Sequence, residues 1–87
     1  MKANEAASYF KALGDDNRLL IIKALHSEEE ICACKFLDIV NCGQATLSHH
    51  LSLLSKMGLL KSRRDGKRIL YSKNKEILNE LMNYLED

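Results

Sequence analysis

The chain has 87 residues, with 13 basic and 12 acidic side chains and a formal net charge of +1. A chain of this length forms one small domain, residues 1–87, and buries only about 60–65% of the surface that its unfolded form exposes, so a dimer would enlarge its core. Its longest uncharged run, residues 39–55, contains many polar side chains, which excludes a transmembrane helix. Three cysteines and no apolar signal near the start of the chain indicate reduced thiols in a cytoplasmic protein.

The basic residues are concentrated in one short segment. Residues 56–68 contain six basic side chains and one acidic side chain, whereas residues 1–55 contain five basic and seven acidic ones. A basic segment in a nearly neutral protein is typical of contact with nucleic-acid phosphates, because each neutralised phosphate releases counterions. The alternative is a solvated, highly charged hairpin without a partner.

Three helices are expected in the first 40 residues. Residues 4–12 are rich in Ala, and Gly14 ends this helix while Asp15 and Asp16 offer caps for the next one. Apolar residues three and four apart predict a second helix over residues 16–26. Ser27 and Glu30 have the spacing of a capping box, which predicts a third helix that carries Ile31, Phe36, Leu37 and Val40.

A turn at Asn41-Cys42-Gly43 separates the third helix from a fourth, predicted over residues 44–57. Two short helices joined by such a turn form a helix-turn-helix, whose second helix lies in the major groove of DNA. The apolar face of this helix leaves short polar side chains outside, which suit phosphates and base edges. The predicted DNA contacts here are Gln44, Thr46, Ser48, His49 and Ser52. An ordinary amphipathic surface helix is the alternative.

Beyond Gly58 the pattern changes from helical to alternating. Residues 59–64 and 67–72 flank Asp65-Gly66, a dipeptide that favours a two-residue hairpin with a type I′ turn. We expect Leu60 and Tyr71 to lie together at the base of this hairpin.

The same register would place cations opposite one another at the hairpin tip. Arg64 would face Lys67, and Arg63 would face Arg68. Like charges directly opposite are unfavourable, so these four side chains are predicted to contact DNA phosphate.

A last helix is predicted over residues 74–86, where apolar residues recur at spacings of one, three and four. This wide stripe is expected to pack with Tyr9, Phe10 and Leu13 against a second copy of the chain. A symmetric dimer would present two recognition helices to half-sites about one helical turn apart.

Several segments together resemble the arsenic-repressor (ArsR/SmtB) family of winged-helix transcription factors. They are Ala12-Leu13-Gly14-Asp15-Asp16-Asn17-Arg18-Leu19, Ser48-His49-His50-Leu51-Ser52-Leu53-Leu54, Gly58-Leu59-Leu60, Arg63-Arg64-Asp65-Gly66-Lys67 and Tyr71. The resemblance implies a mainly α-helical winged helix-turn-helix with one β-hairpin, in the order α-α-α-α-β-β-α. It also implies a homodimer, held by the first and last helices, that represses double-stranded operator DNA and is released by an inducer. His50 would be an interior residue of the recognition helix.

Cys32-Ala33-Cys34 falls at the start of the expected third helix, where metal-sensing members of the family often have such a pair. The resemblance therefore implies that Cys32 and Cys34 are thiolate ligands. Residues two apart on an α-helix point about 200° from each other, so both sulfurs reach one ion only if the first turn unwinds. Unwinding beside the DNA-reading helix would alter DNA binding, and a helix N-terminus would lower the thiol pKa.

The implied inducer is a thiophilic ion, As(III), Sb(III), Cd(II), Pb(II) or Zn(II). Arsenic-sensing relatives commonly have a third cysteine three residues after the second, where this chain has Leu37. Cys42 is the alternative third ligand, within one chain or across a dimer. The family's zinc site on the last helix uses Asp and His ligands. Residues 74–87 contain no His, so this site is not expected here.

Two other hypotheses compete with a metal-sensing repressor. The first is a DNA-binding regulator without a functional metal site, which responds through cysteine oxidation or not at all. The second is a thiol enzyme that uses the cysteine pair, or Cys42 with a nearby His, as its reactive groups. The enzyme hypothesis leaves the basic hairpin unexplained, so no enzymatic activity is expected.

Overall fold

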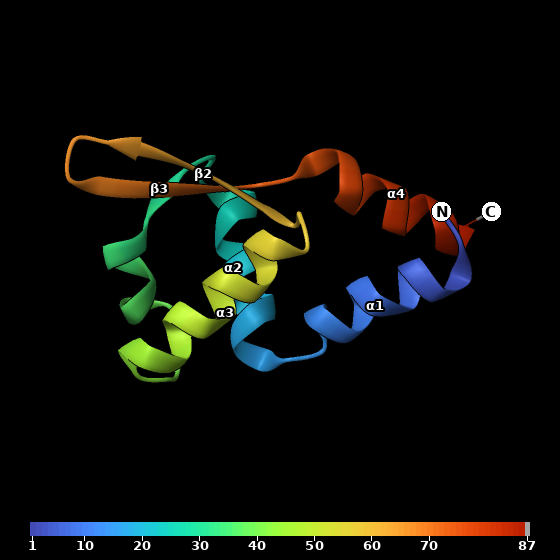
Figure 1. Ribbon diagram of the computed structural model, residues 1–87, viewed down its shortest axis with the longest axis horizontal. Coiled ribbons are helices and arrows are strands. Elements are labelled where there is room, and N and C mark those ends of the chain that lie inside the picture. Colours follow the sequence, from blue (N-terminus) through green and yellow to red (C-terminus); the bar gives the residue numbers. More distant parts are fainter. Residues whose placement is uncertain (87) are drawn as a thin grey trace.

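The computed structural model describes residues 1–86, which form four α-helices, a short 3-10 helix and a three-stranded sheet (Figure 1). The α-helices begin and end within one residue of the predicted limits. They are α1 (Ala3–Leu13), α2 (Asp16–Ser27), α3 (Gln44–Lys56) and α4 (Lys75–Glu86). None of the helices in residues 1–86 is long and apolar enough to cross a membrane.

Local capping explains where α2 begins and where α3 ends. The Asp15 carboxylate accepts a hydrogen bond from the backbone N–H of Arg18 at 3.1 Å, which starts α2 at Asp16. At the end of α3, Gly58 adopts a φ of 80°. The N–H groups of Gly58 and Leu59 then bond to the carbonyls of Ser55 and Leu54, which is the Schellman arrangement and turns the chain toward the sheet.

The predicted third α-helix is wrong. The segment instead forms a two-residue strand, β1 (Ile31–Cys32), followed by the 3-10 helix η1 (Ala33–Asp38), while the supposed capping residue Ser27 is still part of α2. Strand β1 pairs antiparallel with Tyr71 and Leu70 of the hairpin, about 40 residues away. Pairing with this distant strand satisfies the backbone groups that a local helix would have satisfied. The helix-turn-helix therefore has a 3-10 first helix.

The hairpin exists as predicted, but its register is displaced by two residues. Its strands are β2 (Leu60–Asp65) and β3 (Arg68–Lys73), and the sheet order is β1-β3-β2. The turn lies at Gly66-Lys67, with positive φ at Gly66 only, as in a type II′ turn rather than type I′.

The displaced register removes the expected facing cations. Arg63 lies opposite Leu70 and Arg64 opposite Ile69, while Asp65 faces Arg68 and forms an ion pair with it at 2.9 Å. A shift by two residues keeps each side chain on its original face of the sheet, yet it exchanges two repulsive pairs for one attractive pair. Leu60 and Tyr71 are likewise not direct cross-strand partners, since Leu60 pairs with Lys73 and Tyr71 with Ser62, although Leu60 belongs to the hydrophobic core and Tyr71 packs against it.

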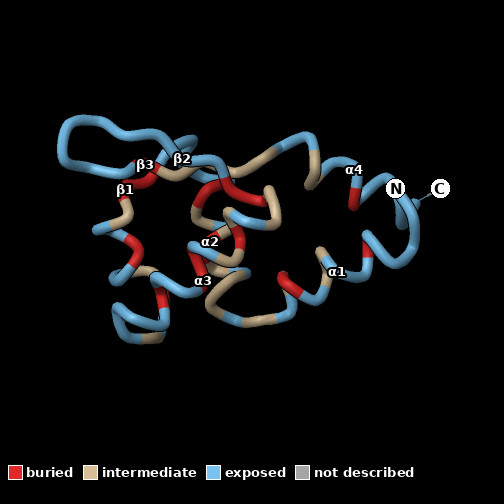
Figure 2. The backbone as a smooth tube through the Cα atoms, viewed as in Figure 1, coloured by how far each residue is buried: buried red, intermediate tan, exposed pale blue. Residues whose placement is uncertain are grey.

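The hydrophobic core lies between the helix-turn-helix and one face of the sheet (Figure 2). Its fully buried large side chains are Ile21, Leu25, Phe36, Leu54, Leu59 and Leu81. Phe36 of η1 meets the ring of Tyr71 edge-on, with centroids 6.1 Å apart. This contact anchors the 3-10 helix to the hairpin.

Helices α1 and α4 lie beside each other at one end of an elongated molecule, 41 × 23 × 21 Å, and the hairpin projects at the other end (Figure 1). Ala6 of α1 and Leu81 of α4 are buried there, but Met82 and Leu85 are 49% and 66% exposed. The mainly α-helical winged helix-turn-helix fold is thus confirmed, whereas the homodimer stays a prediction.

Candidate nucleic-acid interface and thiol site

Helix α3 presents a polar face to solvent. Its buried side chains are Leu47, His50, Leu51 and Leu54, which face the core. All five side chains predicted to contact DNA on this helix, Gln44, Thr46, Ser48, His49 and Ser52, are exposed. The helix therefore has the accessible short polar groups that readout of a groove requires.

The N-terminus of α2 holds α3 in place, a role that the sequence did not reveal. The side-chain oxygen of Asn17 accepts a hydrogen bond from the backbone N–H of Asn41, at 2.8 Å, in the turn before α3. In the middle of α3, the His50 Nε2 atom lies 3.7 Å from the Asp15 carboxylate, and Nδ1 lies 3.4 Å from an Arg18 guanidinium nitrogen. Because Arg18 has only donors, a hydrogen bond between these two groups requires Nδ1 of His50 to accept.

These contacts also affect the charge of the capping carboxylate. The backbone N–H of Arg18 lowers the pKa of Asp15, and the neighbouring His50 and Arg18 side chains lower it further. Asp15 was recognised in the sequence only as a helix cap. Its contact with His50 depends on a residue 35 positions away, which no local pattern signals.

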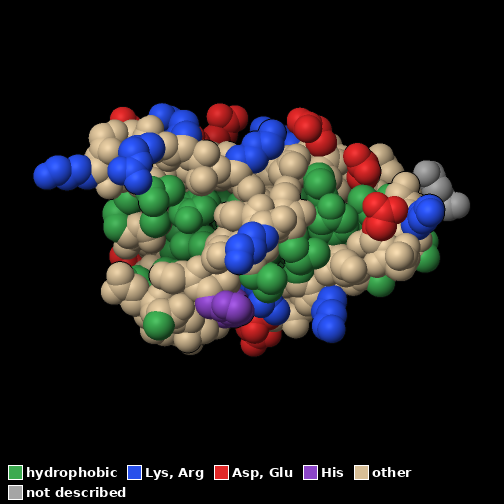
Figure 3. Space-filling model, viewed as in Figure 1, with side chains coloured by type: hydrophobic (Ala, Val, Ile, Leu, Met, Phe, Trp, Pro, Cys, Tyr) green, Lys and Arg blue, Asp and Glu red, His purple; other side chains and the backbone are tan. Residues whose placement is uncertain are grey.

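The hairpin carries the second group of predicted DNA contacts. Arg63, Arg64, Lys67 and Arg68 are all exposed, and basic side chains project from the hairpin end of the molecule (Figure 3). Arg68 pairs with Asp65, as described above. Arg64 and Lys67 form no ion pair within residues 1–86, so their charges are available to a phosphate.

Arg63 is engaged by Glu30. Its Nε and Nη2 atoms donate to the two carboxylate oxygens of Glu30 at 2.6 and 2.7 Å, a bidentate pair. The hydrogen bonds from Arg63 lower the pKa of Glu30. Sequence reasoning assigned Glu30 to a capping box and missed this contact, because Arg63 lies 33 residues away.

The two neighbouring cysteines differ in exposure and in pKa. Cys32 ends β1 and is buried, whereas Cys34 lies in η1 and is exposed. The Cys34 backbone N–H donates to Cys32 Sγ at 3.4 Å. The neighbouring Cys34 thiol lowers the pKa of Cys32, and Cys32 in turn raises the pKa of Cys34. The pKa is therefore lowered for Cys32 only, first by the Cys34 side chain and then by the Cys34 backbone N–H, so the helix N-terminus expected to lower both is not the main cause.

The expected opposition of the two cysteines by about 200° does not apply, because they do not share an α-helix: Cys32 ends β1 and Cys34 lies in η1. The backbone N–H of Cys34 lies 3.4 Å from Cys32 Sγ. Cys42 is half-buried in the turn before α3. Within residues 1–86 no three His, Cys, Asp or Glu side chains gather as a metal site, so one chain supplies two neighbouring sulfurs and no third ligand of this kind.

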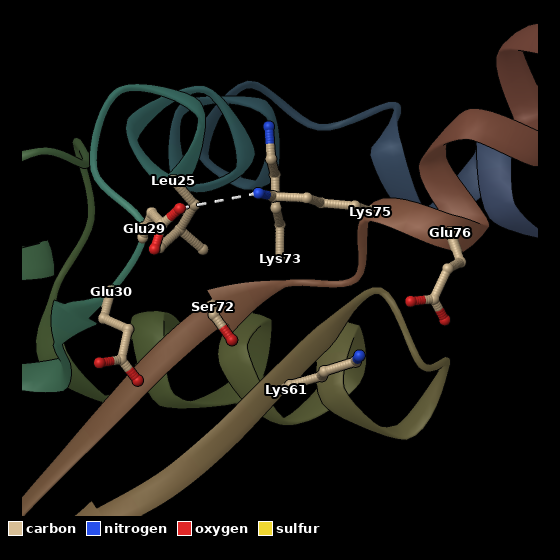
Figure 4. Close-up of a pocket in the computed structure, with 8 residues that line it drawn as sticks. All are labelled: Leu25, Glu29, Glu30, Lys61, Ser72, Lys73, Lys75 and Glu76. Carbon is tan, nitrogen blue, oxygen red and sulfur yellow. Dashed lines mark ion pairs between the residues drawn. The ribbon is translucent and has the colours of Figure 1, made fainter.

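A hollow lies where β3 leads into α4, and it is lined in part by Glu29 and Glu30, which precede the two cysteines in the chain (Figure 4). Its polar and charged lining comprises Glu29, Glu30, Lys61, Ser72, Lys73, Lys75 and Glu76. Glu29 and Lys75 form an ion pair across it at 3.8 Å. The hollow has three cations and three carboxylates, so its charges balance and favour neither an anion nor a cation.

An exposed polar helix beside a basic hairpin defines a winged helix-turn-helix protein of the nucleic-acid-binding class. Residues 15–62 match the model of the bacterial regulatory protein arsR family. This chain belongs to the arsR family.

Relatives and solved structures agree with this assignment. The chain is 46% identical over 74 residues to the cadmium resistance transcriptional regulatory protein CadC of Listeria innocua, covering 84% of this chain and 62% of that protein. It is 36% identical to the arsenical resistance operon repressor of Staphylococcus aureus, covering 98% of this chain and 81% of the repressor. The ArsR-like transcriptional regulator from Rhodococcus sp. RHA1 has a TM-score of 0.82 at 29% identity, covering 95% and 77% of the two chains. This chain thus spans less than two thirds of the cadmium regulator's length.

Proposed function

We propose that this protein is a cytoplasmic transcriptional repressor that binds double-stranded operator DNA as a homodimer and releases it when a thiophilic ion binds Cys32 and Cys34. One observation carries the proposal. The cysteine strand and the basic hairpin belong to the same sheet, since Cys32 pairs with Leu70 of β3. A change at the sulfurs therefore acts on an element that faces DNA.

Two surfaces supply the DNA contacts in this proposal. The exposed polar face of α3 enters the major groove, where Gln44 pairs with adenine and the hydroxyl groups bond phosphates or base edges. Arg64 and Lys67 of the hairpin contact phosphates, because they are exposed and have no internal counter-ion within residues 1–86. Both surfaces are duplicated in a dimer and read two half-sites.

Cd(II) is the first inducer to test, because the 46% identical relative is named for cadmium resistance. As(III), Sb(III), Pb(II) and Zn(II) are the other candidates, since all bind thiolates. Cys32 and Cys34 supply two sulfurs from one chain. A third ligand would have to come from Cys42 after a rearrangement, from the second subunit, or from solvent.

The proposed dimer forms through α1 and α4. Tyr84, Met82 and Leu85 of α4 are large apolar side chains left exposed in one chain. An exposed apolar stripe on an 87-residue chain is a natural site for added core. The second subunit would cover it.

Oxidation of the cysteine pair is the second candidate signal. The Cys34 backbone N–H lies 3.4 Å from Cys32 Sγ, and the lowered pKa of Cys32 favours the reactive thiolate. An oxidant that accepts two electrons, with loss of both thiol protons, would join the sulfurs in a disulfide. Dithiothreitol would reverse this step.

The proposal is tested with labelled DNA from the promoter of the protein's own operon. Binding should weaken as salt rises, and Cd(II) should release the DNA together with sulfur-to-metal absorption in the ultraviolet. Both metal effects should vanish in the Cys32→Ser, Cys34→Ser double variant. Cys42→Ser is the matched control, which decides whether that residue is a ligand.

The possible outcomes separate the hypotheses. Failure to bind the DNA even at low salt would refute the regulator, and release of the double variant by Cd(II) would place the sensor elsewhere. Release by diamide rather than by metal would favour the redox candidate.

A further inference from the structure

The thiol pair and Arg63 are connected through a single residue of the sheet. Leu70 of β3 pairs with Cys32 on one side and with Arg63 on the other, so these three residues form one row across the sheet. Glu30, two residues before Cys32, makes the bidentate ion pair with Arg63. Strand β3 lies between β1 and β2, so this pair crosses it and ties the outer strands together.

From this geometry we propose that Glu30 and Arg63 are positioning residues, which fix the hairpin to the cysteine strand and transmit the state of the sulfurs to the DNA-facing surface. Arg63 is then not a phosphate ligand, in contrast to Arg64 and Lys67. The transmission part of this inference rests on the proposed function, whereas the assignment of Arg63 does not.

The bonding of Arg63 supports a positioning role. A guanidinium offers five N–H donors in a planar fork, and the edge formed by Nε and Nη2 is already occupied by Glu30. Glu30 also neutralises the charge that a phosphate would require. Arg64, the next residue, has the same side chain and no acidic partner within residues 1–86, so it is the natural comparison.

The connection also explains how a small change at the sulfurs would reach DNA. Strand β1 has only two residues, and Cys32 Sγ accepts the Cys34 N–H that begins η1. An ion that takes up both sulfurs competes with this hydrogen bond and shifts Cys32. Because Glu30 and Cys32 flank Ile31, the shift moves the carboxylate that holds Arg63, and β2 moves with it.

The first test separates positioning from phosphate contact. The salt dependence of DNA binding is measured without metal for Arg63→Gln and for the control Arg64→Gln. Loss of one phosphate contact lowers the slope of log K against log salt concentration by about one. We expect that decrease for Arg64→Gln only, whereas Arg63→Gln should weaken binding with an unchanged slope. An equal decrease in slope for Arg63→Gln would overturn the assignment.

The second test measures transmission. Arg63→Lys keeps the positive charge but loses the bidentate geometry, and Glu30→Gln removes the negative charge that pairs with Arg63. We measure the DNA affinity without Cd(II) divided by the affinity with Cd(II). Both variants should reduce this ratio by about 2- to 30-fold, while the sulfur-to-Cd(II) absorption stays at the wild-type level. Arg64→Lys should keep the wild-type ratio. Exchange of the pair, Glu30→Arg with Arg63→Glu, should restore much of the ratio, which a mere folding defect would not do.

Wild-type ratios in both Glu30→Gln and Arg63→Lys would refute transmission through the pair. If wild-type protein neither absorbs with Cd(II) nor releases DNA, the proposed metal response fails and transmission fails with it. The salt slopes would still decide whether Arg63 positions the hairpin.

Discussion

The Nε2 atom of His50, in the middle of the recognition helix, lies 3.7 Å from the carboxylate of Asp15, which caps α2. His50 is the one buried polar residue among residues 1–86, with 7% of its surface exposed. Its neighbour His49 is exposed on the same helix. Two adjacent histidines therefore have different roles, one inside the fold and one on the proposed DNA face.

Replacement of His50 by Ala should destabilise the protein by about 1–3 kcal/mol, because it leaves a cavity and removes the ring that faces Asp15 and Arg18. His49→Ala should change stability by no more than about 0.5 kcal/mol, since that side chain is exposed. Urea unfolding measures both. DNA affinity should fall in both variants, and a His49→Ala protein as unstable as His50→Ala would contradict this division of roles.

Stability should depend on pH through Asp15. Its pKa is lowered from 3.8, chiefly by the hydrogen bond from the Arg18 N–H. A carboxylate whose pKa is lowered by folding stabilises the fold above its unfolded pKa, and this stabilisation disappears as pH falls through the folded value. Asp15→Asn keeps a helix-capping oxygen but has no carboxylate. The wild type should therefore exceed Asp15→Asn in unfolding free energy at about pH 6, and the difference should shrink toward about pH 3. A constant difference across that range would argue against this role.

Of the two residues in the hairpin turn, Gly66 should be the one whose substitution lowers the stability of the fold. Its φ is 64°, and a Cβ added there would meet no atom within 4 Å. Gly66→Ala should therefore cost about 1–2 kcal/mol through backbone strain alone. Lys67→Ala, in the other turn position, has negative φ and should stay within about 0.5 kcal/mol of the wild type. Thermal unfolding of both variants tests the turn, and equal stability of Gly66→Ala and wild type would contradict it.

A charge on the exposed stripe of α4 should prevent dimerisation. Leu85→Glu puts a carboxylate at the most exposed of the large apolar side chains, where burial in a dimer would leave it unpaired. Asn83→Glu introduces the same group away from the stripe and is the matched control. Sedimentation equilibrium should give a monomer for Leu85→Glu and a dimer for Asn83→Glu. A dimeric Leu85→Glu protein would show that another surface joins the subunits.

Local sequence patterns identified the α-helices and the polar face of α3. The periodicity of three and four residues that predicted residues 44–57 as a helix is set by neighbours within a few turns, and α3 occupies Gln44–Lys56. For the same reason the five predicted contact residues on α3 are exposed. Family resemblance to the arsR regulators was confirmed by the match over residues 15–62.

Long-range pairing decided what these patterns could not. Residues 31 and 32 have an apolar pattern that suits either a helix or a strand, and they became β1 only because β3 offered an unpaired edge about 40 residues later. The hairpin register similarly depended on whether Asp65 would face Arg68. Each choice exchanges one set of backbone hydrogen bonds for another, so partners distant in sequence determine it.

The candidate thiol site depends both on local sequence and on long-range pairing. The sequence by itself determined that two cysteines stand one residue apart before the recognition helix. Only the tertiary structure placed Cys32 in the hairpin sheet and joined Glu30 to Arg63. The physical reason is that side chains more than 30 residues apart meet only after the sheet has assembled, and no local pattern records which of them will lie in the same row.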